Sequence, residues 1–327
     1  MKKTLLTILG LLTLVFATSC ENGDKEFDDF DYQTVYFARQ TPVRTITLGE
    51  DQEFPNELDN NHECELQVVI GGVWKNRNDR HVKIAVDNSL VNGLTFDAIN
   101  GTSFANSGRP VMAMPRGYYS LESNEVTIPA GQVRGKCKVH LNDAFFADPK
   151  SAQVTYVLPV KIVQADDSVL KNKDYTLYAI TYKNPYAGMW LDTADGNTKT
   201  ILSTVNMSTV SVANSQSVKI GAGVKDKEKE ISLSATVDFT VGSDGKVVAS
   251  TKSPDVTVTG GGTYQAHGSK VDHSKSWGDK ERDLFALDYT IVYTYDDYGV
   301  KKTVTDHVQK TLVMISRANV NQDFSTK

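Results

Sequence analysis

One stretch in the second half of the chain alternates strictly between apolar and polar residues. From Ile231 to Val241 every odd position is apolar and every even position is polar. A period of two is typical of a β-strand with one face in a core and the other in water. Ser243-Asp244-Gly245 follows and predicts a hairpin turn into another strand at 246–250. This part of the chain is therefore expected to fold as a sheet of long strands.

The same period recurs along most of the chain, with glycine and proline turns between the runs. Only 142–149 predicts a helical turn, with Asn142 as its N-cap. We predict an all-β protein, in which an N-terminal immunoglobulin-like antiparallel β-sandwich precedes a C-terminal antiparallel meander. The meander is expected to form a lipocalin-like β-barrel or an open sandwich. The predicted strands are 34–38, 44–48, 63–70, 81–86, 125–128, 136–141, 155–162, 176–182, 231–241, 246–250, 284–295 and 300–315.

The chain begins with an export signal. Lys2 and Lys3 precede a 14-residue apolar run from Thr4 to Ala17, and Thr18-Ser19-Cys20 follows. A membrane-spanning helix needs about 20 apolar residues, so the run is too short to span a bilayer. Small residues before a cysteine predict a lipoprotein signal that is cleaved to leave a lipid-bearing Cys20 as the first residue. The alternative is an ordinary secretory signal with an incidental cysteine.

Composition shifts predict how the rest of the chain is divided. Residues 20–31 carry six carboxylates without an apolar period, which is typical of a tether. The sequence Asn184-Pro185-Tyr186-Ala187-Gly188 interrupts the strand pattern and predicts a domain boundary. The expected segments are the signal peptide 1–19, the tether 20–31, the sandwich 32–184, the second β domain 185–320 and a polar tail 321–327.

The charge and the motifs argue against several function classes. The formal net charge is −5, and removal of Lys2 and Lys3 with the signal makes it −7. The sequence has no cluster of lysine and arginine residues that could contact the phosphates of a nucleic acid, so we expect no nucleic-acid partner. No catalytic motif is present, and the histidines of 265–273 match no known metal-site spacing. We therefore expect no enzymatic activity, no metal and no cofactor.

Cys64 and Cys137 remain once Cys20 is assigned to the lipid. Each shares strand parity with aliphatic neighbours, so each is expected to face a core. An exported protein can form disulfides. A disulfide requires Cα atoms within about 7 Å, which strand parity alone does not establish. A Cys64–Cys137 disulfide and two buried free thiols both remain open.

Seven short phrases occur in order along the first domain. They are Val35-Tyr36-Phe37, Pro42-Val43-Arg44, Gly71-Gly72-Val73-Trp74, Val86-Asp87-Asn88-Ser89-Leu90, Met114-Pro115-Arg116-Gly117-Tyr118-Tyr119, Phe145-Phe146-Ala147-Asp148-Pro149 and Tyr175-Thr176-Leu177-Tyr178. Together they resemble the uncharacterised N-terminal β-sandwich module of Bacteroidetes lipoproteins, which is often encoded beside outer-membrane glycan-import pairs of the Sus type. The acidic residues after Cys20 also resemble the signal that sends such lipoproteins to the cell surface. The resemblance implies an outer-membrane lipoprotein, which is expected at the cell surface rather than on the periplasmic face.

Two short patterns of the second domain resemble known ones. Gly188-Met189-Trp190 resembles the Gly-x-Trp of lipocalin-like barrels, which implies that Trp190 closes one end of a barrel. Asp192-Thr193-Ala194 resembles the short O-glycosylation acceptor of Bacteroidetes, as does Asp167-Ser168-Val169 in the first domain. Ser168 and Thr193 are therefore candidate glycosylation sites.

Aromatic residues in polar loops are the candidate glycan contacts. Trp277 and Trp74 each lie among hydrogen-bonding residues, and a flat ring can cover the apolar face of a sugar. The alternative for each ring is that it folds back onto the domain. We expect a membrane-anchored, non-enzymatic surface lipoprotein that assists glycan capture next to outer-membrane import proteins. The alternatives are a structural or adhesive protein that binds other envelope proteins, and a lipocalin-like carrier of a small apolar ligand.

Overall fold

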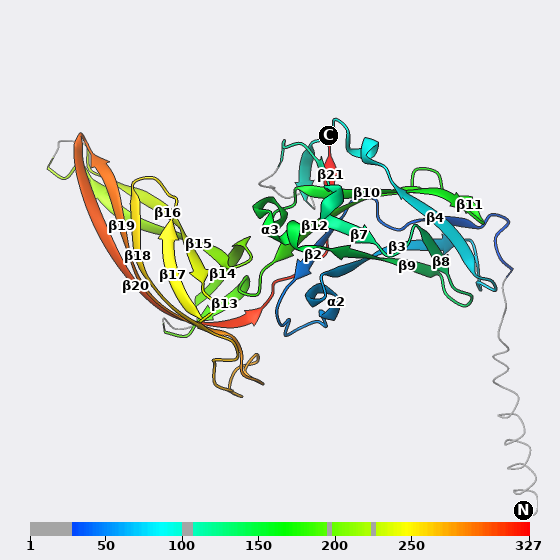
Figure 1. Ribbon diagram of the computed structural model, residues 1–327. Helices are drawn as coiled ribbons and strands as arrows, with labels where there is room; N and C mark the ends of the chain where they lie inside the picture. Colours follow the sequence, from blue (N-terminus) through cyan, green and yellow to red (C-terminus); the bar gives the residue numbers. More distant parts are fainter. Residues whose placement is uncertain (1–27, 100–106, 195–197, 224–226) are drawn as a thin grey trace, which may run out of the picture.

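The computed structural model describes residues 28–99, 107–194, 198–223 and 227–327 (Figure 1). The predicted signal peptide, Cys20 and most of the tether lie outside these ranges. Within them, no helix has both the length and the apolar character of a membrane span. The described chain is nearly all β and forms a two-sheet sandwich and a barrel.

The first sheet of the sandwich has five strands in the order β11-β1-β3-β9-β7. Its centre is the antiparallel pair β3 and β9, in which Glu63 lies opposite His140 and Val69 lies opposite Arg134. Apolar and polar residues alternate along both strands, so one face of the sheet is buried. The strands are β1 (Thr34–Phe37), β3 (Glu63–Gly71), β7 (Tyr119–Leu121), β9 (Arg134–Leu141) and β11 (Ser168–Val169).

The second sheet has eight strands, in the order β5-β21-β2-β12-β10-β4-β8 with β6 paired to β10. Most neighbours are antiparallel, but β2 pairs parallel with β12, and β6 pairs parallel with β10. The strands are β2 (Pro42–Thr47), β4 (Arg80–Val86), β5 (Phe96–Ile99), β6 (Met112–Ala113), β8 (Glu125–Ile128), β10 (Tyr156–Ala165), β12 (Tyr175–Lys183) and β21 (Gln322–Thr326).

Apolar side chains fill the space between the two sheets and confirm the predicted sandwich. Leu66 and Val139 from the first sheet meet Ile84 and Leu158 from the second, and each is at most 2% exposed. A smaller cluster covers the outer face of the second sheet, where Val157 packs with residues of β5 and β21. The second sheet is thus apolar on both faces over part of its area.

Short helical turns connect the strands of the sandwich. The predicted turn at 142–149 is present as α3 (Asp143–Ala147), and Ala144 donates a backbone hydrogen bond of 3.2 Å to Oδ1 of its cap Asn142. The other turns are α2 (Glu57–Asn60) and the 3₁₀ turns η1 (Asn88–Val91), η2 (Arg116–Tyr118) and η3 (Pro149–Ala152).

The second domain is a closed antiparallel barrel, which resolves the choice between barrel and open sandwich. Its strands run consecutively from β13 to β20, and β13 closes the ring by pairing with both β14 and β20. Figure 1 shows β19 and β20 as the longest hairpin. The strands are β13 (Gly188–Asp192), β14 (Thr198–Asn206), β15 (Thr209–Ile220), β16 (Lys229–Val241), β17 (Lys246–Thr251), β18 (Val256–Gln265), β19 (Leu284–Asp297) and β20 (Val300–Ser316).

Large side chains pack against one another inside the barrel. The rings of Trp190 and Phe285 lie 4.8 Å apart, and those of Phe239 and Tyr289 lie 5.2 Å apart. Trp190 is fully buried and its indole N–H donates to the carbonyl oxygen of Tyr186. This packing argues against the carrier alternative, which requires interior space for an apolar molecule.

The last residues return to the sandwich, and the predicted polar tail at 321–327 is therefore wrong. Residues 322–326 form β21, which pairs with β2 and β5, and Phe324 is 3% exposed against Phe96. One buried aromatic ring and two strand neighbours fix this segment, although it shows no apolar period. The barrel is thus inserted between β12 and β21 of one sheet (Figure 1).

Candidate functional site

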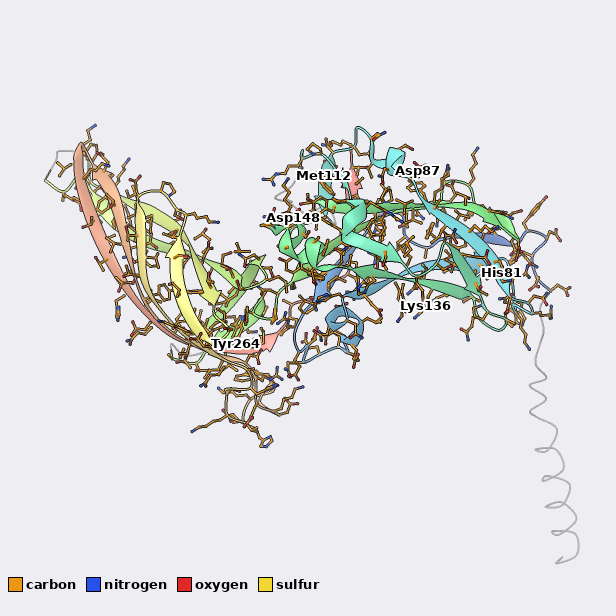
Figure 2. The ribbon with its side chains drawn as sticks, in the orientation of Figure 1. His81, Asp87, Met112, Lys136, Asp148 and Tyr264 are labelled. Carbon is orange, nitrogen blue, oxygen red and sulfur yellow. The ribbon has the colours of Figure 1, made fainter. Side chains whose placement is uncertain are left out.

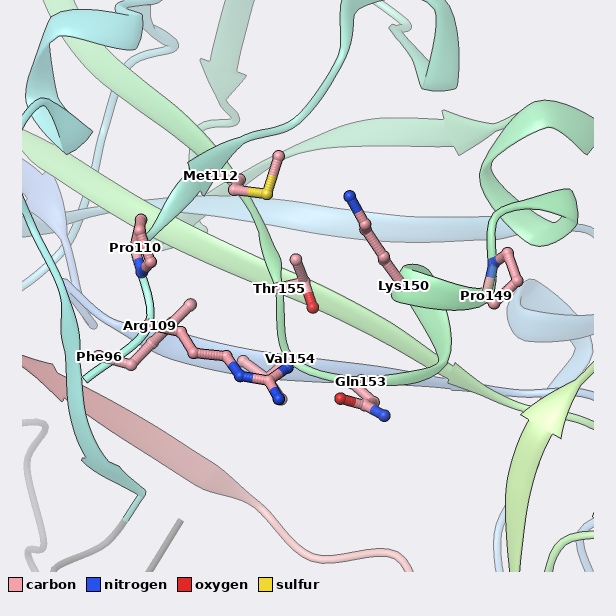
Figure 3. Close-up of a pocket in the computed structure, with 9 residues that line it drawn as sticks. All are labelled: Phe96, Arg109, Pro110, Met112, Pro149, Lys150, Gln153, Val154 and Thr155. Atoms are coloured by element: carbon pink, nitrogen blue, oxygen red, sulfur yellow. The ribbon is translucent and has the colours of Figure 1, made fainter. Parts of the chain in front are cut away.

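A pocket of about 370 Å³ opens on the sandwich beside η3 (Figure 3). Its size falls within the range of small-ligand sites, about 300–1,000 Å³. One side is formed by β5 and by the segment that enters β6, and the other by η3 and the residues that lead into β10. The lining residues are Phe96, Arg109, Pro110, Met112, Pro149, Lys150, Gln153, Val154 and Thr155.

The η3 side of the pocket is fixed by a half-buried hydrogen-bond network around Asp148. Asp148 caps η3, and its Oδ1 accepts a 2.9 Å hydrogen bond from the backbone N–H of Lys150. Its Oδ2 accepts hydrogen bonds from the hydroxyls of Tyr118 and Tyr156. Burial raises the pKa of Asp148, but these hydrogen bonds and the Lys150 charge outweigh it, and the net pKa is lowered. Asp148 therefore stays a carboxylate that holds the turn.

Backbone hydrogen bonds fix the opposite side. Phe96 bonds two successive residues, since its N–H donates to the carbonyl of Arg109 at 2.9 Å and its carbonyl accepts from the N–H of Gly108 at 2.7 Å. Gly108 has a φ of +79°, a conformation that side-chain-bearing residues rarely adopt. This turn directs Arg109 to the pocket.

The charged side chains that line the pocket are both positive. Arg109 and Lys150 are the charged residues among its described lining, and in the described chain neither side chain has a hydrogen-bond or ion-pair partner. Gln153 and Thr155 add an amide and a hydroxyl. The side chain of Met112, 39% exposed, adds an apolar surface. The pocket can therefore bind an anionic group and sugar hydroxyls together.

A second depression of about 680 Å³ lies at the joint between the two domains. Pro149 and Gln153 line it as well as the first pocket, so η3 separates the two. Its other side is formed by barrel residues, among them Ile201 and Ser203 of β14. The first pocket thus belongs to the sandwich alone, whereas the second depression is shared by the two domains.

Buried polar contacts hold the domains at this joint. Arg317 follows β20, is 1% exposed, and donates to the backbone carbonyls of Leu48, Asn184 and Pro185. Lys183 at the end of β12 donates to the carbonyls of Arg317 and Ala318 at 2.7 and 2.8 Å. These bonds cross between the domains and fix the barrel on the sandwich.

The two tryptophans predicted as glycan contacts lie on different domains, and neither lines the pocket. Trp74 is 56% exposed, and its backbone N–H donates to Asp29. Trp277 is half-buried in the loop between β18 and β19. Lys280 of that loop pairs with Glu50 of the sandwich at 3.1 Å. The structure thus does not bring the two rings together in one site.

The two cysteines in the described chain are free and buried, so the Cys64–Cys137 disulfide is not formed. Cys64 lies opposite Val139, and Cys137 lies opposite Leu66, so the thiols are diagonal neighbours on β3 and β9. Diagonal positions on adjacent strands lie about 7–8 Å apart, too far for a disulfide of ordinary geometry. Burial raises the pKa of Cys64 to about 12.

The remaining candidates are surface residues. Ser168 in β11 and Thr193 after β13 are both exposed, as an acceptor hydroxyl requires. The Thr193 hydroxyl donates to the carbonyl of Thr311 at 3.1 Å. Among the described residues, no group of three or more His, Cys, Asp or Glu side chains could hold a metal ion. Cys20 lies outside the described ranges.

Sequence patterns missed Arg109, Lys150 and Gln153. The Asp148-Pro149 pair was a usable signal, because an aspartate before a proline is typical of the start of a helical turn. No comparable signal marks Arg109, which reaches the pocket through pairing with β5.

Two family models match separate parts of the chain. A model described as "-like, N-terminal domain" matches residues 30–169, and the model of a domain of unknown function, DUF5627, matches residues 192–318. Comparison with the curated proteins found no match. The first match falls on the sandwich and the second on the barrel.

Solved structures with a similar fold come from Bacteroides ovatus. One of unknown function is 28% identical with a TM-score of 0.72, and the alignment covers 91% of this chain and 99% of that one. Another of unknown function and a multidomain protein that includes DUF1735 are each 16% identical. Their TM-scores are 0.44 and 0.43, and each alignment covers 90% of this chain and 94% of the other. The first of these structures resembles the chain across both domains.

Proposed function

We propose that the protein is a membrane-anchored, non-enzymatic lipoprotein of the cell surface that assists glycan capture. The pocket beside η3 carries the proposal. It is open, its apolar surface from Met112 and Pro110 suits the C–H face of a sugar, and Gln153 and Thr155 suit the hydroxyls. The Bacteroides relative that is 28% identical is consistent with such a setting.

The side chains around the pocket favour binding over hydrolysis. Glycoside hydrolysis uses two carboxylates about 5 to 10 Å apart. The described lining residues include no carboxylate, and nearby Asp148 is occupied by two tyrosine hydroxyls and the η3 backbone. A group held in this way supports the wall of a binding site.

The anchor is the second part of the proposal. The apolar run that ends at Cys20 supports lipid attachment, and the acidic residues that follow support an outward-facing position. A lipid at the N-terminus would hold the binding domain near import proteins in the outer membrane. Replacement of Cys20 by Ser should release the protein from the membrane fraction, and a membrane-bound Cys20→Ser protein would contradict the anchor.

Glycan binding is tested with the full chain in detergent by affinity electrophoresis and calorimetry against plant and host glycans. Gln153→Trp fills the pocket and should abolish binding, whereas Gln132→Trp, at an exposed turn elsewhere on the sandwich, should leave it intact. Absence of binding to every glycan would contradict the proposal. Equal binding by the two variants would remove the pocket from it.

A further inference from the structure

The pocket beside η3 also indicates which glycans it selects. We infer that it recognises acidic saccharides, whose carboxylate or sulfate groups lie between Arg109 and Lys150. The inference rests on the proposed function and specifies its substrate class. It depends on the charge, position and surroundings of these two side chains.

Neither Arg109 nor Lys150 forms an ion pair in the described part of the chain, although Lys150 lies close enough to the Asp148 carboxylate for its charge to lower the pKa of that group. Charged side chains at a surface usually lie near an opposite charge, and a free pair at one opening leaves a local positive potential. Other cations of the sandwich do pair with carboxylates, namely Arg39 with Asp323, Arg44 with Asp59, Arg77 with Asp29, Arg80 with Asp167, Lys136 with Glu65, Lys138 with Glu63, Lys161 with Asp174 and Lys327 with Asp97.

Arg109 and Lys150 reach the pocket from opposite sides. Figure 3 shows Arg109 extending toward Val154 and Gln153, while Lys150 rises from η3 on the far side of Thr155. An arginine guanidinium can donate two parallel hydrogen bonds to a carboxylate or sulfate, and a lysine ammonium supplies a compact second charge. The site therefore offers one fork-shaped donor and one point charge to an acidic sugar.

The positive charge at the pocket contrasts with the net negative charge of the whole chain. The whole chain carries a formal charge of −5, so an anionic polymer is repelled by most of the surface. Attraction at the pocket then favours one docking position. The hydroxyl of Thr155 and the amide of Gln153 lie at the same opening, where they can bind the neutral hydroxyls of the sugar.

Matched glycans that differ only in charge test the inference. Calorimetry with the full chain in detergent compares oligogalacturonate with its methyl ester, and sulfated galactan with desulfated galactan. At least one acidic member should bind about tenfold or more tightly than its neutral partner, because a hydrogen bond to a charged group outweighs one to a neutral group. Equal binding of acidic and neutral members would overturn the inference and leave glycan capture standing. Binding of neither would overturn both.

Substitutions then locate the acidic group. Arg109→Gln and Lys150→Gln should each weaken binding of the acidic glycan about tenfold and so reduce its advantage over the neutral glycan. The control substitutions Arg134→Gln and Lys171→Gln remove exposed charges on the same domain and should have no effect. Circular dichroism checks that the variants fold. Acid-selective binding that survives both pocket substitutions would overturn the assignment to this pocket.

Discussion

The guanidinium of Arg317, just beyond the last barrel strand, donates a 2.8 Å hydrogen bond to the backbone carbonyl of Leu48 in the sandwich. The same side chain bonds the carbonyls of Asn184 and Pro185, so it links the chain entering the barrel to the chain leaving it. Burial lowers the pKa of Arg317 to about 10, and the group is still charged at neutral pH. One buried cation thus holds both connections between the domains.

Replacement of Arg317 by Leu should destabilise the protein. The substitution removes the Arg317 donors from the carbonyls of Leu48 and Pro185, whereas the Asn184 carbonyl keeps the backbone N–H of Ala187, and each buried group left without a donor costs about 1–3 kcal/mol. We expect the free energy of unfolding in urea to fall by about 2 kcal/mol or more. Arg134→Leu, at an exposed position, is the control. An unchanged urea midpoint for Arg317→Leu would show that the joint depends on other contacts.

Phe324→Ala should weaken the sandwich although it lies at the end of the chain. Loss of a buried phenylalanine typically costs about 3–5 kcal/mol. Phe324 packs on Phe96 of β5, which lines the pocket, so amide hydrogen exchange should rise in β5 and β2. Ser325→Ala, in the same strand but exposed, should change neither the stability of the sandwich nor the hydrogen exchange of β5 and β2. Unchanged exchange in β5 would mean that β21 is not needed for the pocket.

Because of Lys183, the free energy of unfolding should change with pH in the alkaline range. Burial lowers its pKa to about 8, and the charge of Arg317 contributes to the shift. Above this pH the folded protein loses a proton that the unfolded chain keeps until pH values near 10.5, so this group raises stability as pH increases. The stability of the wild type relative to Lys183→Met should therefore rise between pH 8 and 10. Parallel pH profiles for the two proteins would contradict the shift.

Cys64 and Cys137 should behave as buried thiols. In the native protein neither should react with iodoacetamide, because both are about 1% exposed and burial raises the pKa of each. In guanidinium without reductant both should be labelled, as peptide mass spectrometry can show. If label appeared at the two cysteines only after reduction, the protein in solution would contain the disulfide that the structure lacks.

Strands with a regular apolar period could be predicted from the sequence even when short, as for the four-residue β1 and β8, whereas the longer β14, β15 and β18 were missed. The alternation at 231–241 is confirmed as part of β16 (Lys229–Val241), because thirteen residues give the period room to repeat. β6 and β11 have two residues each, too few to show any period, and their partners come from distant parts of the chain. β21 was missed for the same reason, since Phe324 is its one buried residue.

The candidate site was harder to predict than the fold. Arg109 and Lys150 belong to unrelated segments of the sequence, and they meet because β5 and η3 lie on either side of one opening. Neither segment alone differs from an ordinary polar loop. For the tryptophans, the sequence left open whether each ring folds back onto its domain, and it could not show whether the two rings share a surface; Trp74 is 56% exposed.

The central claim is that the pocket beside η3 binds a saccharide. A crystal structure of the protein with oligogalacturonate tests it most directly. The account predicts the sugar in this pocket, with a carboxylate between Arg109 and Lys150 and hydroxyls near Gln153 and Thr155. A saccharide bound instead at the Trp277 loop, at Trp74 or inside the barrel would contradict it.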